Sequence, residues 1–207
     1  SNRWDEWRKI ETDQKKGVPP PPPQKPHPKS SKLVELVSPE ELTIGRMPLI
    51  DAIKRRRSRR TYTEEPFTLE ELSFLLWATQ GISKIATGDI SKNLREVLTR
   101  SRAILRTVPS GGARHPFETY LLINRVTGVK PGLYRYLPID NKLCLLSTDR
   151  KLVGKVHEAS FEQYVESSAV TFIWTAIPYR TAWRYDMLTP KLIAQDSGHV
   201  CQNLYLA

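Results

Sequence analysis

Residues 54–60 read Lys-Arg-Arg-Arg-Ser-Arg-Arg and close an apparent short helix that begins at Pro48. The unpaired carbonyls and negative dipole at the end of a helix explain one or two cations there. Six cations exceed that need. The cluster therefore predicts an anionic ligand, whereas a solvated basic face or a nucleic-acid patch is the plainer alternative for such a run.

A second motif, over residues 109–116, reads Pro-Ser-Gly-Gly-Ala-Arg-His-Pro and leads into an alternating strand over 119–123. Glycines carry no side chain, so the backbone amides of such a turn can approach a flat ligand closely. An ordinary loop turn is the alternative, because a pair of glycines before a strand is common.

Together, the stretches 56–62 and 109–116 resemble the two flavin-mononucleotide signatures of the nitroreductase family, and the SagB-type dehydrogenase branch is the nearer match. Residues 69–81, 131–136 and 198–204 resemble the same branch, so the resemblance extends from roughly the proline-rich segment to the last residue. It implies an α+β fold, a nitroreductase-like three-layer sandwich in which helices flank a mainly antiparallel central sheet.

The resemblance also implies a flavin site divided between the two motifs. The basic cluster matches the positions that hold the phosphate and ribityl chain, and guanidinium forks suit a phosphate because they donate paired hydrogen bonds. The small-residue turn matches the segment that approaches the isoalloxazine ring from the opposite subunit. The implied cofactor-binding residues are Arg56, Arg57, Ser58, Arg60, Pro109, Ser110, Gly111, Ala113 and Gln163, the last of these on a looser match.

Two positions depart from the family pattern. Many nitroreductases place an asparagine where Ala113 stands and a glutamine where His115 stands. Small residues at such positions favour the SagB-type branch.

The function implied is that of an FMN-dependent oxidoreductase, a homodimer with two flavins at its interface. Hydride would pass from NAD(P)H or a substrate to the flavin, in a nitro or quinone reductase or in a dehydrogenase that aromatises azoline rings of peptides. No acid, base or nucleophile is assigned, because orientation of donor and acceptor supplies much of the effect. The alternatives are a flavin-scaffold interaction protein without turnover and a basic nucleic-acid-binding protein. The second is disfavoured, since the cluster is confined to a helix end without exposed aromatic partners.

Bulk properties agree with one basic domain. The chain has 207 residues, a formal net charge of +10 and a pI near 9.7, which favours anionic partners. No apolar run reaches the roughly eighteen residues of a membrane span, and the first residues lack the apolar core of a signal peptide, so a cytoplasmic protein is expected. Cys144 and Cys201 stand alone, and with four scattered histidines they encode neither a disulfide framework nor a zinc site.

The first 47 residues are predicted to form an extended proline-rich arm before a domain over 48–207. Nine of the sixteen prolines lie at or before Pro48, including the run Pro19 to Pro23, which imposes polyproline geometry. The arm is expected to drape across the globular part or a second subunit. Its expected anchors are Trp4, Trp7, Leu33, Val34 and Leu36. A ligand for a proline-reading domain is the alternative.

Hydrophobic periodicity and capping signals predict the elements of the domain. Pro48 opens a short amphipathic helix, and a capping box at Thr68 opens a second helix that ends before Gly81. Strands are predicted over 119–124, 132–137 and 142–146, with an antiparallel pair formed by the first two. Asp149 is expected to cap a helix, and the apolar run 169–176 is expected to be a central strand. Residues 82–108 suggest a mobile lid or a poorly packed helix.

The last helix is expected to open with Thr189 as its cap and Pro190 in its first turn. Its polar stripe of Gln195, His199 and Gln202 would be satisfied by neighbouring backbone, a subunit partner or a ligand. Because the chain stops within apolar periodicity at Ala207, the domain is predicted to be incomplete at its C-terminus.

Overall fold

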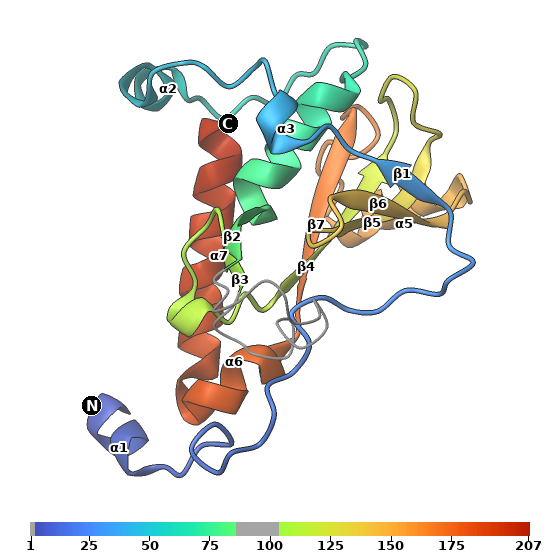
Figure 1. Ribbon diagram of the computed structural model, residues 1–207. Coiled ribbons are helices and arrows are strands. Elements are labelled where there is room, and N and C mark those ends of the chain that lie inside the picture. Colours follow the sequence, from blue (N-terminus) through green and yellow to red (C-terminus); the bar gives the residue numbers. More distant parts are fainter. Residues whose placement is uncertain (1–2, 86–103) are drawn as a thin grey trace.

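The computed structural model describes residues 3–85 and 104–207, and its centre is a five-stranded sheet. The strand order is β1-β6-β5-β4-β7, and every neighbouring pair is antiparallel (Figure 1). The strands are β1 (Leu33–Glu35), β4 (Phe117–Ile123), β5 (Gly132–Leu137), β6 (Lys142–Ser147) and β7 (Val170–Ala176). The predicted antiparallel pair is β4 and β5, which a short connection joins as a meander.

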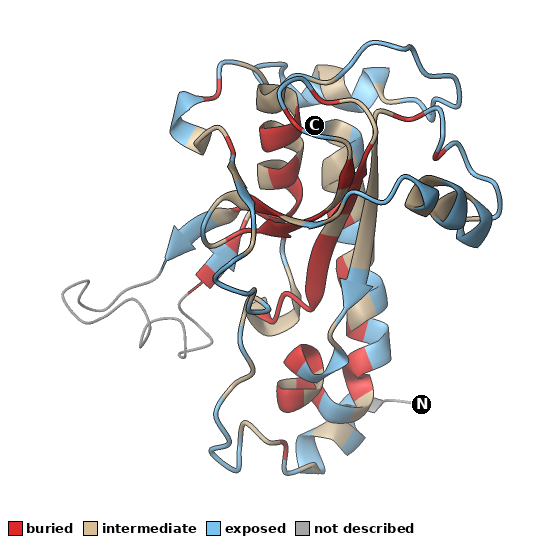
Figure 2. Cartoon of the chain, turned by 90° about the vertical axis from the view of Figure 1, so that its right-hand side faces the viewer, coloured by how far each residue is buried: buried red, intermediate tan, exposed pale blue. Residues whose placement is uncertain are grey.

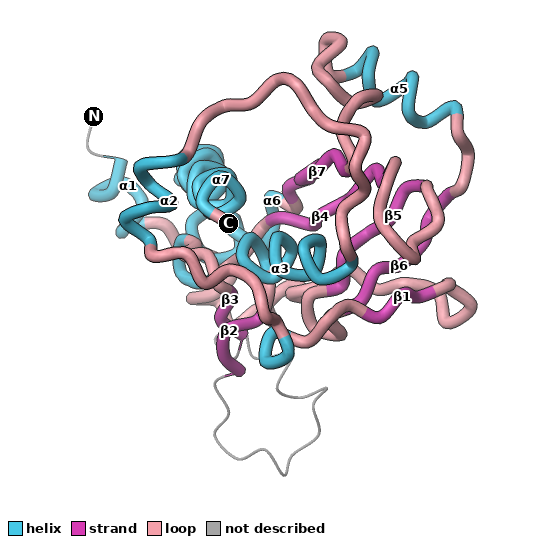
Figure 3. The backbone as a smooth tube through the Cα atoms, turned by 90° about the horizontal axis from the view of Figure 1, so that it is seen from above, coloured by secondary structure: helices cyan, strands magenta, loops and turns pink. Residues whose placement is uncertain are grey.

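Helices lie on both sides of this sheet. Helix α3 (Leu69–Gln80) and helix α7 (Thr189–Leu206) lie on one side, and α5 (Lys151–Ala159) lies on the other (Figure 3). Leu72 and Leu76 of α3 are fully buried and pack in one cluster with sheet residues that include Leu121, Tyr134 and Leu143. Figure 2 shows the buried residues concentrated in the sheet and in the helix faces toward it. The predicted α+β sandwich is therefore confirmed.

Helix α3 begins where its capping box predicts. The Glu71 N–H donates to the Thr68 hydroxyl at 3.1 Å, and the Glu71 carboxylate accepts the Thr68 N–H at 2.8 Å. Two donors at the start of the helix are satisfied by this exchange. The helix ends at Gln80, directly before Gly81, as the sequence indicates.

Shorter elements complete the chain. They are α1 (Arg3–Lys9), α2 (Leu49–Arg55) and α6 (Pro178–Tyr185), the 3-10 turns η1 (Pro39–Glu41), η2 (Gly111–Ala113) and η3 (Asp186–Leu188), and the antiparallel strands β2 (Ile82–Ile85) and β3 (Ile104–Arg106). The ends of the segment predicted to be a lid or a poorly packed helix thus form a ladder. Its middle, residues 86–103, lies outside the described residues.

The prediction that residues 169–176 form a central strand is wrong. Within the described residues, β7 pairs with β4 alone and forms an edge of the sheet. Phe172 and Trp174 of β7 pack against the core clusters, and most of the strand is only half-buried. An apolar run indicates that side chains are buried. It does not indicate whether the strand has one or two neighbouring strands in the sheet.

Two predicted helix starts are displaced. Arg150, not Asp149, occupies the capping position of α5, although the Asp149 carboxylate accepts the Lys151 N–H at 2.9 Å. Thr189 is already the first residue of α7, and its hydroxyl donates to the Asp186 carbonyl at 2.6 Å. In both places the preceding turn already has helical backbone geometry, so the helix does not begin at the residue that the side-chain signal marks.

The proline-rich segment crosses the globular part from α1 past α6 to β1 (Figure 1). Of the expected anchors, Leu36 is buried in the main core cluster and Val34 packs against it, while Trp7 stacks on Tyr185 with ring centroids 5.7 Å apart. Leu33 and Trp4 are exposed. Within the described residues, no helix has the length and hydropathy to cross a membrane.

Candidate functional site

The basic cluster lies at the end of α2 and just beyond it. The helix ends at Arg55, and the Arg56 N–H closes it by donating to the Ala52 carbonyl at 2.9 Å. Arg56 is half-buried, and the following residues through Arg60 are exposed. Within the described part of the chain, no guanidinium of the cluster forms an ion pair with a carboxylate. Its positive charge is therefore not neutralised by the described residues.

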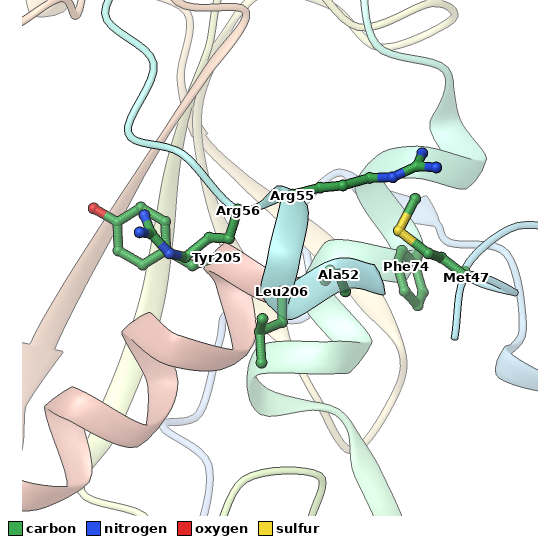
Figure 4. Close-up of a pocket in the computed structure, with 9 residues that line it drawn as sticks. Met47, Ala52, Arg55, Arg56, Phe74, Tyr205 and Leu206 are labelled. Atoms are coloured by element: carbon green, nitrogen blue, oxygen red, sulfur yellow. The ribbon is translucent and has the colours of Figure 1, made fainter. Parts of the chain in front are cut away.

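A pocket of about 240 Å³ opens beside the first arginines of the cluster. Its lining joins α2 to α3 and to the end of α7, through Gly45, Met47, Ala52, Arg55, Arg56, Phe74, Tyr205, Leu206 and Ala207. Arg56 lies over the ring of Tyr205, with the guanidinium carbon 5.9 Å from the ring centroid, while Arg55 extends toward Met47 (Figure 4). Tyr205 thereby positions one cation of the cluster.

The apolar face of α2 does not pack into the core of this chain. Leu49, Ile50 and Ile53 are 64%, 60% and 56% exposed. The helix is amphipathic as predicted, yet its apolar side lies at the surface next to the pocket. Leu49 also lines a second, more open pocket of about 450 Å³ that shares Phe74, Leu206 and Ala207 with the first.

The small-residue turn adopts a strained backbone. Gly112 has φ +61°, and Ala113 and His115 also have positive φ. A Cβ at position 112 would lie 2.7 Å from the Tyr185 hydroxyl. The glycine at 112 is thus required by its own backbone and by packing against α6, in addition to any close approach of a ligand.

A buried carboxylate on α7 anchors this turn. Asp196, 3% exposed, accepts the Ser110 hydroxyl at 2.5 Å and the Gly111 N–H at 3.1 Å. The Ser110 oxygen in turn accepts the His115 N–H at 2.9 Å. Among the turn amides, the N–H groups of Ser110 and Gly112 have no acceptor within the described residues.

Sequence reasoning missed Asp196, and its predicted polar stripe on α7 is satisfied in part by neighbouring backbone. Gln195, His199 and Gln202 are exposed, although the His199 Nδ1 lies 3.2 Å from the Pro109 carbonyl. The signal for Asp196 was its place on the apolar stripe, since the buried residues of α7 are Thr189, Leu192, Asp196 and Val200. A carboxylate at that spacing indicates a buried acceptor with donors opposite it.

A group of buried charges lies behind the turn. Arg106, Arg180 and Glu118 are 7%, 2% and 4% exposed, and a guanidinium nitrogen of Arg180 donates to the Glu118 carboxylate. Burial, with nearby Arg180, lowers the pKa of Arg106 to about 10. Burial, with the positive charges of Arg106, Arg114 and Arg180, lowers the pKa of His115 to about 3. His115 is therefore a neutral imidazole at physiological pH.

One chain does not bring the two motifs together. The basic cluster contacts α7 at Tyr205, whereas the small-residue turn contacts it at Asp196, nine residues earlier. At the helical rise of 1.5 Å per residue this separation is about 13 Å. In Figure 1 the light-green turn lies beside the lower half of α7, and α2 lies near its upper end.

Gln163 lies in an exposed turn, and three neighbours in that turn, Phe161, Glu162 and Tyr164, have positive φ. The rings of Tyr164 and Tyr62 lie 6.2 Å apart, which places this turn beside the segment that follows the basic cluster. The contact of Gln163 with the flavin ring stays a prediction.

Comparison with known proteins assigns the chain to a class. Residues 53–207 match the nitroreductase family. A nitroreductase-family protein of Methanocaldococcus jannaschii, MJ1384, is 30% identical over 164 residues, which cover 79% of this chain and 74% of that protein. The chain belongs to the nitroreductase family. Membership of this family indicates flavin-dependent oxidoreduction.

Further similarities support the fold. Nitroreductase-like structures from Anabaena variabilis and Ralstonia eutropha align over 89% and 90% of this chain with TM-scores of 0.59 and 0.60, at 24% and 25% identity. The chain spans 32% of the first structure and 74% of the second. The Escherichia coli microcin synthetase McbBCD complex, with truncated pro-MccB17 bound, aligns over 87% of this chain and 60% of that one with a TM-score of 0.53 at 18% identity.

A relative named for trifolitoxin processing also matches. The trifolitoxin-processing protein TfxB of Rhizobium leguminosarum bv. trifolii is 29% identical over 107 residues. That match covers 49% of this chain and 29% of TfxB.

Proposed function

We propose that the protein is an FMN-dependent oxidoreductase of the SagB-type branch, a homodimer in which each flavin binds at the interface. The observation that carries the proposal is the group of unneutralised cations beside a pocket, on a fold whose family is flavin-dependent. The flavin, when bound, accepts and donates hydride, with NAD(P)H as the electron donor.

The phosphate is assigned to the basic cluster. Arg56, Arg57 and Arg60 supply paired donors, and Ser58 supplies a hydroxyl. Because Tyr205 holds the Arg56 guanidinium against the end of α7, that cation loses less conformational freedom on binding an anion. Among these donors Arg56 lines the pocket, and Arg57, Ser58 and Arg60 follow it in the exposed segment beyond α2.

The ring is assigned to the small-residue turn of the opposite subunit. Asp196 holds Ser110 and Gly111, and this leaves the Gly112 N–H available for a ring edge on which negative charge grows during reduction. Pro109 and Ala113 complete the turn without bulky side chains. Within one chain the two motifs contact α7 about 13 Å apart, which is compatible with a site divided between subunits.

A peptide is the second candidate substrate, beside a small nitro compound or quinone. The similarity to a protein named for trifolitoxin processing favours a dehydrogenase that acts on a modified peptide. Incubation of the flavin-loaded protein with azoline-containing peptides, read by the loss of two mass units, separates this reaction from nitro reduction.

The phosphate assignment is tested by Arg56→Ala combined with Arg60→Ala. Both side chains face away from the core, so the double variant is expected to unfold at the same denaturant concentration as the parent while its flavin affinity falls at least tenfold. Flavin absorbance after gel filtration measures the occupancy.

The matched control is Lys54→Ala with Arg59→Ala, which removes two charges of the same cluster and is expected to retain the flavin. Equal occupancy in both double variants would overturn the assignment. A protein that binds flavin yet resists reduction by NADH, NADPH and substrate would instead be an interaction protein on a flavin scaffold. A colourless protein that binds nucleic acid would support the basic-patch alternative.

A further inference from the structure

Part of the proline-rich segment, residues 18–26, is held as an array of carbonyl acceptors. Polyproline backbone has no internal hydrogen bonds, and proline has no N–H, so this segment presents carbonyls almost alone. Three buried guanidiniums from three different elements each donate to one of them at 2.9 Å: Arg106 of β3 to Pro23, Arg135 of β5 to Pro26 and Arg180 of α6 to Pro22.

Two further main-chain groups of this segment also pair a donor with an acceptor. The Lys25 N–H, one of the few amides in the segment, donates at 3.0 Å to the buried Glu118 carboxylate, the same group that accepts Arg180. The indole N–H of Trp183 donates to the Val18 carbonyl at 2.8 Å. Buried guanidiniums meet carbonyls, and the buried carboxylate meets an N–H, so the segment binds largely through its main chain. The Gln24 side chain adds hydrogen bonds to Asp140 and to the Ile139 N–H.

Helix α6 makes contact with this segment and with the small-residue turn. Arg180, bound to Pro22, also donates to the His115 carbonyl at 3.4 Å. The Arg114 guanidinium lies 5.0 Å from the centroid of the Trp183 ring, whose N–H holds Val18. The two α6 side chains that hold the proline-rich segment, Arg180 and Trp183, therefore also contact residues of the turn.

We propose that residues 18–26 are a strap that positions the turn over 109–116 through Arg180 and Trp183. Without the strap, the Arg180 Nε loses the Pro22 carbonyl and the Glu118 carboxylate loses the Lys25 N–H. The buried Arg180–Glu118 pair is then less firmly placed, and with it the contact of Arg180 with the His115 carbonyl. Arg180 is thus a positioning residue of the turn. The link from the strap to flavin affinity rests on the proposed function, because there the turn faces the flavin ring.

The test removes a single backbone N–H from the strap in the full chain. Lys25→Pro keeps every carbonyl of the strap and removes the N–H that Glu118 accepts, and its place before Pro26 favours extended backbone. Lys25→Gln is the matched control, since it removes the same exposed charge and retains the N–H. In flavin-free protein, amide hydrogen exchange at His115 is expected to accelerate at least tenfold in Lys25→Pro only, with Leu121 and Tyr134 in the sheet unchanged.

Trp183→Phe provides a second variant if Lys25→Pro does not fold, because it removes the N–H to Val18 and keeps a ring beneath Arg114. If amide hydrogen exchange at His115 stays at the parental rate in a folded variant, the strap proposal is wrong. Flavin affinity is measured separately and is expected to fall at least tenfold in Lys25→Pro. If the parent chain binds no flavin, the proposed function fails while hydrogen exchange still decides on the strap.

Discussion

The imidazole of His115, at the end of the small-residue turn, has a strongly lowered pKa. It is 7% exposed, and neither ring nitrogen has a partner within the described residues. Burial first, and then the neighbouring guanidiniums, lower its pKa to about 3 from an ordinary value near 6.5. Between these two pH values His115 is protonated in the unfolded chain and neutral in the folded chain. The contribution to stability is therefore complete above pH 6.5 and is lost as the pH falls toward 3.

His115→Asn is expected to remove this pH dependence. From the pKa difference, the parent should lose about 2 kcal/mol of unfolding free energy between pH 7.5 and pH 5.0 through this histidine alone. Asparagine tolerates the positive φ at this position better than most residues do. Urea unfolding of the parent and of the variant is measured at both pH values. The difference between the two proteins separates the effect of His115 from that of the carboxylates. Parallel pH profiles would show that folding does not lower the pKa of His115.

At the scale of elements, the Ser110 hydroxyl is one of the contacts that attach the small-residue turn to α7. Ser110→Ala leaves the His115 N–H without its acceptor and removes a donor from the buried carboxylate of Asp196. The expected loss is about 1–3 kcal/mol of unfolding free energy in flavin-free protein.

Ser197→Ala is the control for this prediction, because its hydroxyl donates only to the Ala194 carbonyl within α7. It should change the unfolding free energy by less than about 0.5 kcal/mol in the same denaturation experiment. Similar values for the two variants would mean that the turn is held by other contacts.

Local signals predicted some elements better than others, for physical reasons. Helix α3 was located at both ends because its capping box and its following glycine act within a few residues. Strand β7 was identified as a strand but misplaced in the sheet, since strand order depends on partners far away in sequence. The ladder of β2 and β3 escaped prediction because each strand is short and its partner lies about twenty residues away.

For the whole molecule, we expect a homodimer. Leu49, Ile50 and Ile53 expose an apolar face on α2 beside the pocket, and the two cofactor motifs lie apart within one chain. Light scattering should give twice the 23.8 kDa of one chain. Leu49→Glu with Ile53→Glu should yield a monomer that also loses flavin, because charge on this face disfavours its burial.

Leu146→Glu, at another exposed leucine on β6, is the matched control and should leave the mass unchanged. A monomer with full flavin content in the parent would contradict both the dimer and the division of the site between subunits.

The sequence alone was sufficient to predict the family through the resemblance of its local motifs, and that resemblance implied the α+β sandwich and the two motifs proposed for the flavin. Only the tertiary structure showed that Asp196 holds the turn, that Arg180 joins the turn to the proline-rich segment and that Tyr205 positions Arg56. Each of these contacts joins residues 85 to 158 positions apart or crosses between separate elements. Hydrogen bonds and charge pairs act over a few ångströms, so folding alone decides which distant residues they connect.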